Sequence, residues 1–86
     1  MRKLENVIEE VISVSENKDF NNELLNIKNS ISLTAPELMS TRWNQVHEIM
    51  LDYTIANNEK PQYDWQYEVI SIFSTKSIDE LKSIFN

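Results

Sequence analysis

The chain contains no glycine, and this absence restricts its fold more than any motif that it carries. Average usage near 7% would place about six glycines in a chain of this length. The tight turns that join neighbouring strands need residues with positive φ, which glycine adopts at the least cost. Such turns must here use asparagine or be avoided, so the sequence offers little support for β-hairpins.

Apolar residues recur instead at the spacing of one helical face. Residues 3–16 predict an amphipathic helix with four glutamates around the rest of its circumference. A second helix follows, with Asp19 as its expected N-cap. Its apolar positions recur at intervals of four, three and four: Phe20, Leu24, Ile27 and Ile31.

The clearest local signal for a helix start is LTAPEL, residues 33–38. Thr34 and Glu37 have the spacing of a capping box, and Leu33 and Leu38 occupy the positions of a hydrophobic staple. We therefore expect a long helix of about 22 residues, or about 33 Å, to begin here. Its apolar stripe fades at residues 57–58.

The segment SIDELKSIF, residues 77–85, repeats this pattern. Ser77 and Glu80 form a second predicted capping box, and Ile78, Leu81 and Phe85 share one face. The sequence thus predicts a short final helix.

The segment YDWQYEV, residues 63–69, alternates large apolar and polar side chains, as a half-buried strand does. No other segment shows this alternation, so a strand here would lack a partner for its backbone. We therefore expect a helix, which places Trp65 and Val69 on one face and Tyr63 and Tyr67 on another. Apolar groups around so much of a helix fit either a central core position or a surface that contacts a partner.

Together these patterns predict an all-α fold, a small single-domain bundle of four to five short helices formed by residues 1–86. The chain has no cysteine, which suits a reducing compartment, and no apolar run of membrane-spanning length. Its N-terminal residues lack the apolar run of a signal peptide. We expect a cytoplasmic protein that binds no membrane.

The net charge is −6, spread evenly along the chain. Binding to nucleic acid depends on clustered Lys and Arg side chains that neutralise phosphates, and the sequence has no such cluster. We expect no direct binding to nucleic acid. A basic protein is the more plausible partner.

Few residues are suited to catalysis or to metal binding. The chain has one histidine, His47, no cysteine, and no glycine-rich loop to hold a phosphate. The pairs Glu9-Glu10 and Asp79-Glu80 are adjacent in sequence, so on helices their carboxylates diverge. We expect no enzyme, no cofactor and no metal site.

One six-residue run resembles a catalytic motif. RWNQVH, residues 42–47, is similar to the Arg-x4-6-His motif of HEPN ribonucleases, a helical family that pairs the motif across a dimer. The resemblance implies that Arg42 would steady a phosphate and that His47 would act in acid–base catalysis. It covers these six residues only. The other interpretation is a surface arginine and a histidine at the edge of the core.

A second short run, IKNSIS at residues 27–32, is similar to a segment near the start of the colicin DNase immunity proteins, which are acidic helical inhibitors of about this length. In this chain the run lies in the middle of the sequence. The Tyr-Tyr-Pro motif of that family does not follow it, so the run does not indicate membership.

The function that the sequence favours is that of a small acidic inhibitor or adaptor, of the toxin-immunity or phage anti-defence type, which occludes a basic partner enzyme that handles nucleic acids. The alternatives are a helical subunit that forms a homodimer and, less favoured, a HEPN-like ribonuclease. A strip of aromatic and acidic residues is the predicted partner-binding surface: Tyr63, Asp64, Trp65, Tyr67 and Glu68, with Glu48 and Asp52 on the preceding helix.

Overall fold

A computed structural model describes residues 2–56 and 60–85, and within these ranges the chain contains five α-helices, one 3-10 turn and no strand. The predicted all-α bundle is confirmed. The elements are α1 (Leu4–Val14), α2 (Lys18–Ile31), η1 (Pro36–Leu38), α3 (Met39–Thr54), α4 (Asp64–Ser74) and α5 (Ile78–Phe85).

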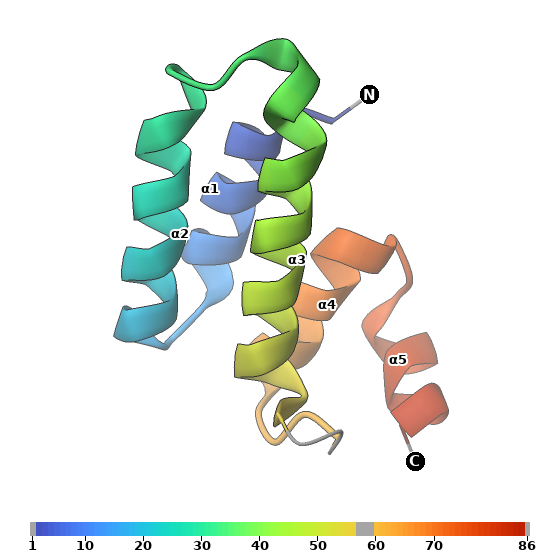
Figure 1. The fold of residues 1–86 in the computed structure, drawn as a ribbon. Helices are drawn as coiled ribbons and strands as arrows, with labels where there is room; N and C mark the ends of the chain where they lie inside the picture. The colour runs from blue at the N-terminus through green and yellow to red at the C-terminus, as the bar shows by residue number, and fades with distance from the viewer. Residues whose placement is uncertain (1, 57–59, 86) are drawn as a thin grey trace.

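The first four helices form a closed ring of contacts (Figure 1). Each helix packs antiparallel to the next one in sequence, and α4 returns to pack against α1. This is the up-and-down arrangement that short loops between consecutive helices impose. The last helix, α5, lies outside this ring and packs on α4.

A single hydrophobic core runs through the bundle. Phe20 is fully buried in it, with its ring stacked on that of Tyr53 (centres 5.0 Å apart) and tilted against that of Trp65 (centres 6.3 Å apart). These three aromatic rings join α2, α3 and α4. The buried apolar side chains are Leu4, Val7, Ile8, Val11, Phe20, Leu24, Val46, Met50, Trp65, Tyr67, Val69, Ile70 and Leu81.

The start of α2 differs from the prediction by two residues. Asn17 is the N-cap, and its side-chain oxygen accepts a hydrogen bond of 3.0 Å from the backbone N–H of Phe20. Asp19, the predicted cap, lies in the first turn. A carboxylate there still favours the helix, because it faces the positive end of the helix dipole.

The predicted capping box at Thr34 and Glu37 is wrong. The Thr34 hydroxyl donates to the Ser30 carbonyl (2.8 Å), so it binds the end of α2 and caps no following helix. Without that cap the chain forms the 3-10 turn η1 first, and α3 begins at Met39 and has 16 residues. Leu33 and Leu38 are 89% and 54% exposed, so they make no staple. The predicted fade at residues 57–58 lies outside the described residues.

At the start of α5 the prediction for Ser77 is confirmed. Its hydroxyl accepts a hydrogen bond of 3.1 Å from the Glu80 N–H, and the Glu80 carboxylate lies 3.3 Å from the same hydroxyl. Just before it, Thr75 ends α4 with φ 61 and ψ 14, in the left-handed region. The expectation that asparagine takes positive φ is wrong at this turn. A β-branched residue there costs more than glycine would.

The N-terminal residues contact the C-terminal end of α4. The Arg2 guanidinium donates to the carbonyl oxygens of Ile72 and Phe73, in the last turn of α4. A cation at this position satisfies free carbonyls and the negative end of the helix dipole. None of the helices in the described ranges has the length and apolarity that crossing a bilayer requires.

Candidate functional site

The predicted contact strip is divided between the core and the surface. The segment YDWQYEV is helical from Asp64 onward, as predicted. Trp65 and Tyr67 are each 8% exposed and belong to the hydrophobic core. Tyr63 and Asp64 are exposed, and Glu68 is half-buried. Within this segment, Trp65 and Tyr67 are therefore core residues, and Tyr63 and Asp64 are surface residues.

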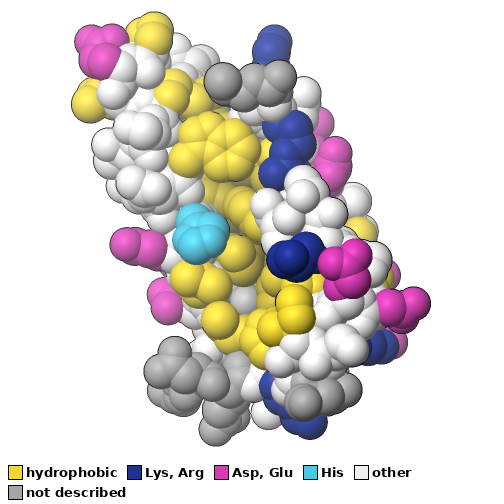
Figure 2. Space-filling view, turned by 90° about the vertical axis from the view of Figure 1, so that its right-hand side faces the viewer, with side chains coloured by type: hydrophobic (Ala, Val, Ile, Leu, Met, Phe, Trp, Pro, Cys, Tyr) yellow, Lys and Arg dark blue, Asp and Glu magenta, His cyan; other side chains and the backbone are white. Residues whose placement is uncertain are grey.

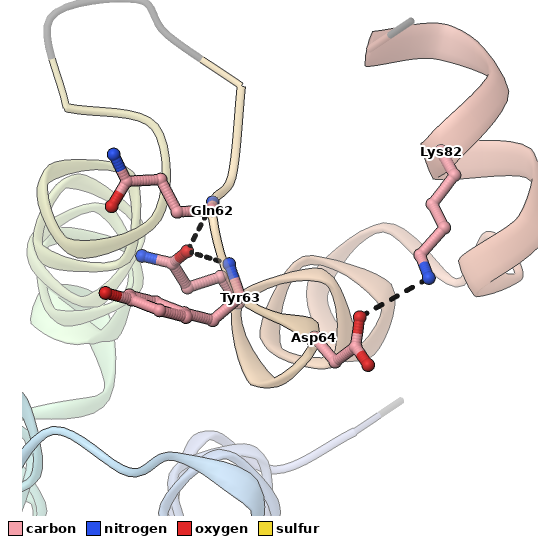
Figure 3. A network of polar contacts seen from close by, with 5 residues as sticks. Gln62, Tyr63, Asp64 and Lys82 are labelled. Atoms are coloured by element: carbon pink, nitrogen blue, oxygen red, sulfur yellow. Dashed lines mark hydrogen bonds and ion pairs between the residues drawn. The ribbon is translucent and has the colours of Figure 1, made fainter.

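The two surface residues point in different directions (Figure 3). Tyr63, 59% exposed, extends its ring toward α3, whereas Asp64 points toward α5. The Asp64 carboxylate lies 3.4 Å from the Lys82 ammonium group, and that ammonium lies 5.5 Å from the centre of the Tyr67 ring. Asp64 and Tyr63 thus belong to two separate surfaces.

Gln66 fixes the position of Tyr63. Its side-chain oxygen accepts hydrogen bonds from the N–H groups of Gln62 (2.7 Å) and Tyr63 (2.8 Å). Its amide nitrogen donates to the carbonyl of Tyr53 (2.9 Å) at the end of α3. One side chain thereby caps α4 and ties its start to α3, which holds Tyr63 close to the end of that helix.

Around Tyr53 the structure gathers carboxylates from two helices. The interaction with the Glu23 side chain, partial burial, and the negative charges of Glu23, Asp19 and Asp52 raise the pKa of the Tyr53 phenol from 10.0 to about 12. Glu48 lies one turn before Asp52 on α3, so the two side chains are neighbours. We call Asp19, Glu23, Glu48 and Asp52 the acidic end of the α2–α3 pair; all four are exposed.

A groove of about 430 Å³ lies between α2 and α3. The half-buried side chains of Ile27 and Ile49 line it, Glu48 lies at the side of the acidic end, and Arg42 lies toward the other. The Arg42 guanidinium donates to Thr34 Oγ1 (3.2 Å) and Gln45 Oε1 (2.9 Å), both of them neutral. We call this the α2/α3 groove; its lining residues are Asn26, Ile27, Ser30, Arg42, Gln45, Glu48 and Ile49.

On the other side of α3 lies a second, smaller groove of about 190 Å³, the His47 groove. Figure 2 shows apolar side chains gathered along this face beside the histidine, which is His47. The imidazole lies edge-on to the Phe73 ring, with centres 6.3 Å apart. The residues that line it are His47, Met50, Leu51, Ile55, Ile70, Phe73, Ser74 and Phe85.

Arg42 and His47, the pair that resembles the HEPN motif, therefore line different grooves on opposite sides of α3. Five residues along a helix turn the side chain through about 140°. Within one chain, the guanidinium and the imidazole do not face a common substrate position. The arrangement gives the ribonuclease interpretation no support.

A third depression, of about 670 Å³, lies between the start of α4 and α5 and includes Asp64, Tyr67 and Lys82. In this depression, Asp64 of α4 pairs with Lys82 of α5. In the described ranges, no group of three or more His, Asp or Glu side chains converges in a way that could hold a metal ion.

Sequence reasoning found Glu48 and Asp52 but missed Tyr53, Asp19 and Glu23. A signal for them was present. Asp19 and Glu23 are four residues apart, as are Glu48 and Asp52, so each pair shares a helix face. Two consecutive antiparallel helices with such pairs at the end of one and the start of the other place four carboxylates at the same end of the helix pair.

Comparisons of the chain with protein-family models, with curated proteins and with solved structures found no match. The resemblances to HEPN ribonucleases and to colicin immunity proteins stay predictions from short sequence runs.

Proposed function

We propose that this protein is a small acidic binding protein that covers, and thereby inhibits or recruits, a basic protein partner. The observation that carries the proposal is the acidic end, where α2 and α3 place Asp19, Glu23 and Asp52 near Tyr53, with Glu48 one helical turn before Asp52. The overall charge of −6 adds to the negative potential there. Such a surface attracts basic proteins and speeds their encounter.

The carboxylates at this end are free to meet an external cation. Among the described residues, ion pairs join Lys28 to Glu9 (2.8 Å) and Lys82 to Asp64 (3.4 Å), and none involves the acidic end. Exposed Tyr63, held near the end of α3 by Gln66, adds an aromatic contact next to these charges. Tyrosine and arginine are the residues that most often dominate binding energy at protein interfaces.

The anchors of this surface differ from those predicted from the sequence. Trp65 packs in the core against Phe20 and Tyr67 packs toward α5 against Phe85, whereas Tyr63, Glu48 and Asp52 are exposed. The proposed contact surface is therefore the acidic end with Tyr63. Asp64 and Glu68 are not required for binding in this proposal.

The test uses a variant with the acidic end neutralised and a control with the same net charge. The first carries Asp19→Asn, Glu23→Gln, Glu48→Gln and Asp52→Asn. The control carries Glu5→Gln, Glu10→Gln, Glu37→Gln and Asp79→Asn, which lie away from that end. Both move the net charge by four units, and circular dichroism verifies that both are folded.

Each protein is used for affinity capture from a lysate of the organism that encodes it, and the partner is then purified and titrated by calorimetry at two salt concentrations. We expect a basic partner that binds wild type and control alike and binds the neutralised variant at least tenfold more weakly. Higher salt should weaken the wild-type complex. An acidic partner, or equal affinity for the two variants, contradicts the proposal.

The proposal also expects a monomer before the partner binds. Sedimentation of the free protein measures this directly. A stable dimer would instead favour the alternative of a self-associating subunit, for which the His47 groove supplies an apolar surface.

A further inference from the structure

We infer that the partner presents an amphipathic α-helix, which lies along the α2/α3 groove with basic side chains over the acidic end and an acidic side chain at Arg42. This inference rests on the proposed function and specifies where and in which direction the partner binds. It follows from three properties of the groove: its shape, its apolar lining and the separation of charge between its ends.

The shape fits a helix. The groove lies between two antiparallel neighbouring helices, which is the surface on which a third helix packs in helical bundles. From Arg42 to Ile49 it follows seven residues of α3, or about 10 Å, which corresponds to about two turns of a bound helix, and Asp52 lies about one turn beyond. Apolar residues of a partner at positions i, i+3 or i+4, and i+7 would contact this length.

The lining supplies the apolar contact. Ile27 from α2 and Ile49 from α3 are half-buried and lie between the polar ends of the groove. Asn26, Ser30 and Gln45 supply hydrogen-bonding groups beside them. A helix with a narrow apolar stripe and polar flanks matches this surface better than a flat apolar face does.

The charges set the direction. Glu48 lies in the groove, Asp52 follows it by one turn, and Glu23 precedes Ile27 by one turn on the facing helix. Arg42, toward the other end, contacts only the neutral side chains of Thr34 and Gln45 through its hydrogen bonds. An occupant that is basic at one end and acidic at the other satisfies both ends, and one with the opposite order brings like charges together.

The experiment is a selection from a displayed library of 18-residue helical peptides. The library has a fixed apolar stripe and Lys, Glu or Gln at every flanking position. Selection is run against the wild-type chain, against a groove variant, Ile27→Gln with Ile49→Gln, and against a control variant, Leu25→Gln with Ile84→Gln. Leu25 and Ile84 are exposed at 39% and 62% and lie outside the groove, so the control also loses two surface apolar side chains.

We expect enriched peptides with Lys gathered at one end and Glu at the other. They should bind wild type and control equally and the groove variant at least tenfold more weakly. A nitroxide label at the Lys end should broaden the amide resonances of Asp19, Glu23 and Asp52 more strongly than those of Thr34 and Arg42.

The inference is overturned by a failure to enrich any peptide, by random charge order, by equal binding to the groove variant, or by stronger broadening at the Arg42 end than at the acidic end. Its failure is distinct from that of the proposed function. If the captured basic partner depends on the acidic end and binds the groove variant as well as wild type, only the helix-docking inference is lost. If no basic partner is captured by the wild-type protein, the proposed function is lost.

Discussion

Helix α3 separates two grooves of opposite character. On one side, the α2/α3 groove has an apolar centre with Glu48 and the acidic end at one extreme and Arg42 toward the other. On the opposite side, the His47 groove is lined mainly by apolar side chains, with His47 and Ser74 as its polar members. The same sixteen-residue helix thus presents charge on one side and apolar surface on the other.

Because of this difference, the chemistry of an occupant can be inferred for one groove and not for the other. An apolar surface supplies binding energy in proportion to its buried area and accepts many occupants. Charges placed at the ends of a groove select among occupants, because the wrong order leaves carboxylates facing carboxylates. The chemistry of the expected partner can therefore be stated for the α2/α3 groove alone.

The largest effect is expected from a core residue that lines neither groove. Trp65 of α4 is 8% exposed and its ring centre lies 6.3 Å from that of Phe20 in α2, which in turn stacks on Tyr53 in α3. Trp65→Ala should lower the free energy of unfolding by about 3–5 kcal/mol, as for other buried aromatics cut to alanine. Urea denaturation followed by circular dichroism measures this change.

The matched control for Trp65 is Tyr63→Ala, two residues earlier. Since Tyr63 is 59% exposed, this variant should change stability by less than about 0.5 kcal/mol. Trp65→Phe, which retains most of the apolar volume, should fall between the two. Equal destabilisation by the alanine variants at 63 and 65 would refute the division of the strip into core and surface.

A smaller and more local effect is expected from Leu81→Ala. Leu81 is 3% exposed and anchors α5, which packs on α4 outside the four-helix ring. Loss of this side chain should cost about 2–3 kcal/mol. Hydrogen exchange should then show faster exchange in α5, with α2 and α3 still protected, because α5 contacts neither of them extensively.

This variant should alter only one of the two grooves. The His47 groove loses Phe85 when α5 loosens, whereas the α2/α3 groove keeps all of its lining residues. Partner affinity should therefore remain within twofold of wild type. A tenfold loss would place the binding surface on the α5 side.

The smallest expected effect is on the pKa of Tyr53 at the acidic end. Glu23, burial and nearby carboxylates raise the pKa of Tyr53 from 10.0 to about 12, which means that the folded chain favours the neutral phenol. The stabilisation this provides is complete below pH 10 and is lost as the pH rises toward 12. Titration of phenolate absorbance in wild type should show a late step that Tyr53→Phe lacks.

The control for this titration is Glu23→Gln, which removes the first cause of the shift. It should move the late step toward lower pH without abolishing it. If the Tyr53→Phe variant retains the late step, the acidic end is not assembled as described.

The sequence predicted the fold class and most helices because apolar residues recur at helical spacing, and that periodicity directly reflects the buried face. It mispredicted the start of α3. Thr34 and Glu37 have the right spacing for a capping box, but the Thr34 hydroxyl binds the Ser30 carbonyl at the end of α2. The end of α2 and the start of the next helix could both bind the Thr34 hydroxyl, and a motif confined to residues 34–37 does not include the Ser30 carbonyl.

The candidate site was predicted in part. Glu48 and Asp52 were identified because they are acidic and lie on a helix, while Trp65 and Tyr67 were offered for the surface and pack in the core. Aromatic side chains supply both core and interfaces, so composition does not separate the two uses. The contribution of Asp19 and Glu23 depends on α2 lying beside α3, a tertiary relation that no local pattern contains.

The contact of α1 with α4 affects how the chain folds while it is being synthesised. Arg2, just before α1, binds the carbonyl of Ile72 in α4, 70 residues later in the sequence, and α1 packs on α4. A ribosome adds about 5–20 residues per second, so α1 waits several seconds for this partner. During that interval the apolar face of α1, which includes Leu4, can be covered by α2 alone and lacks the contact that α4 provides.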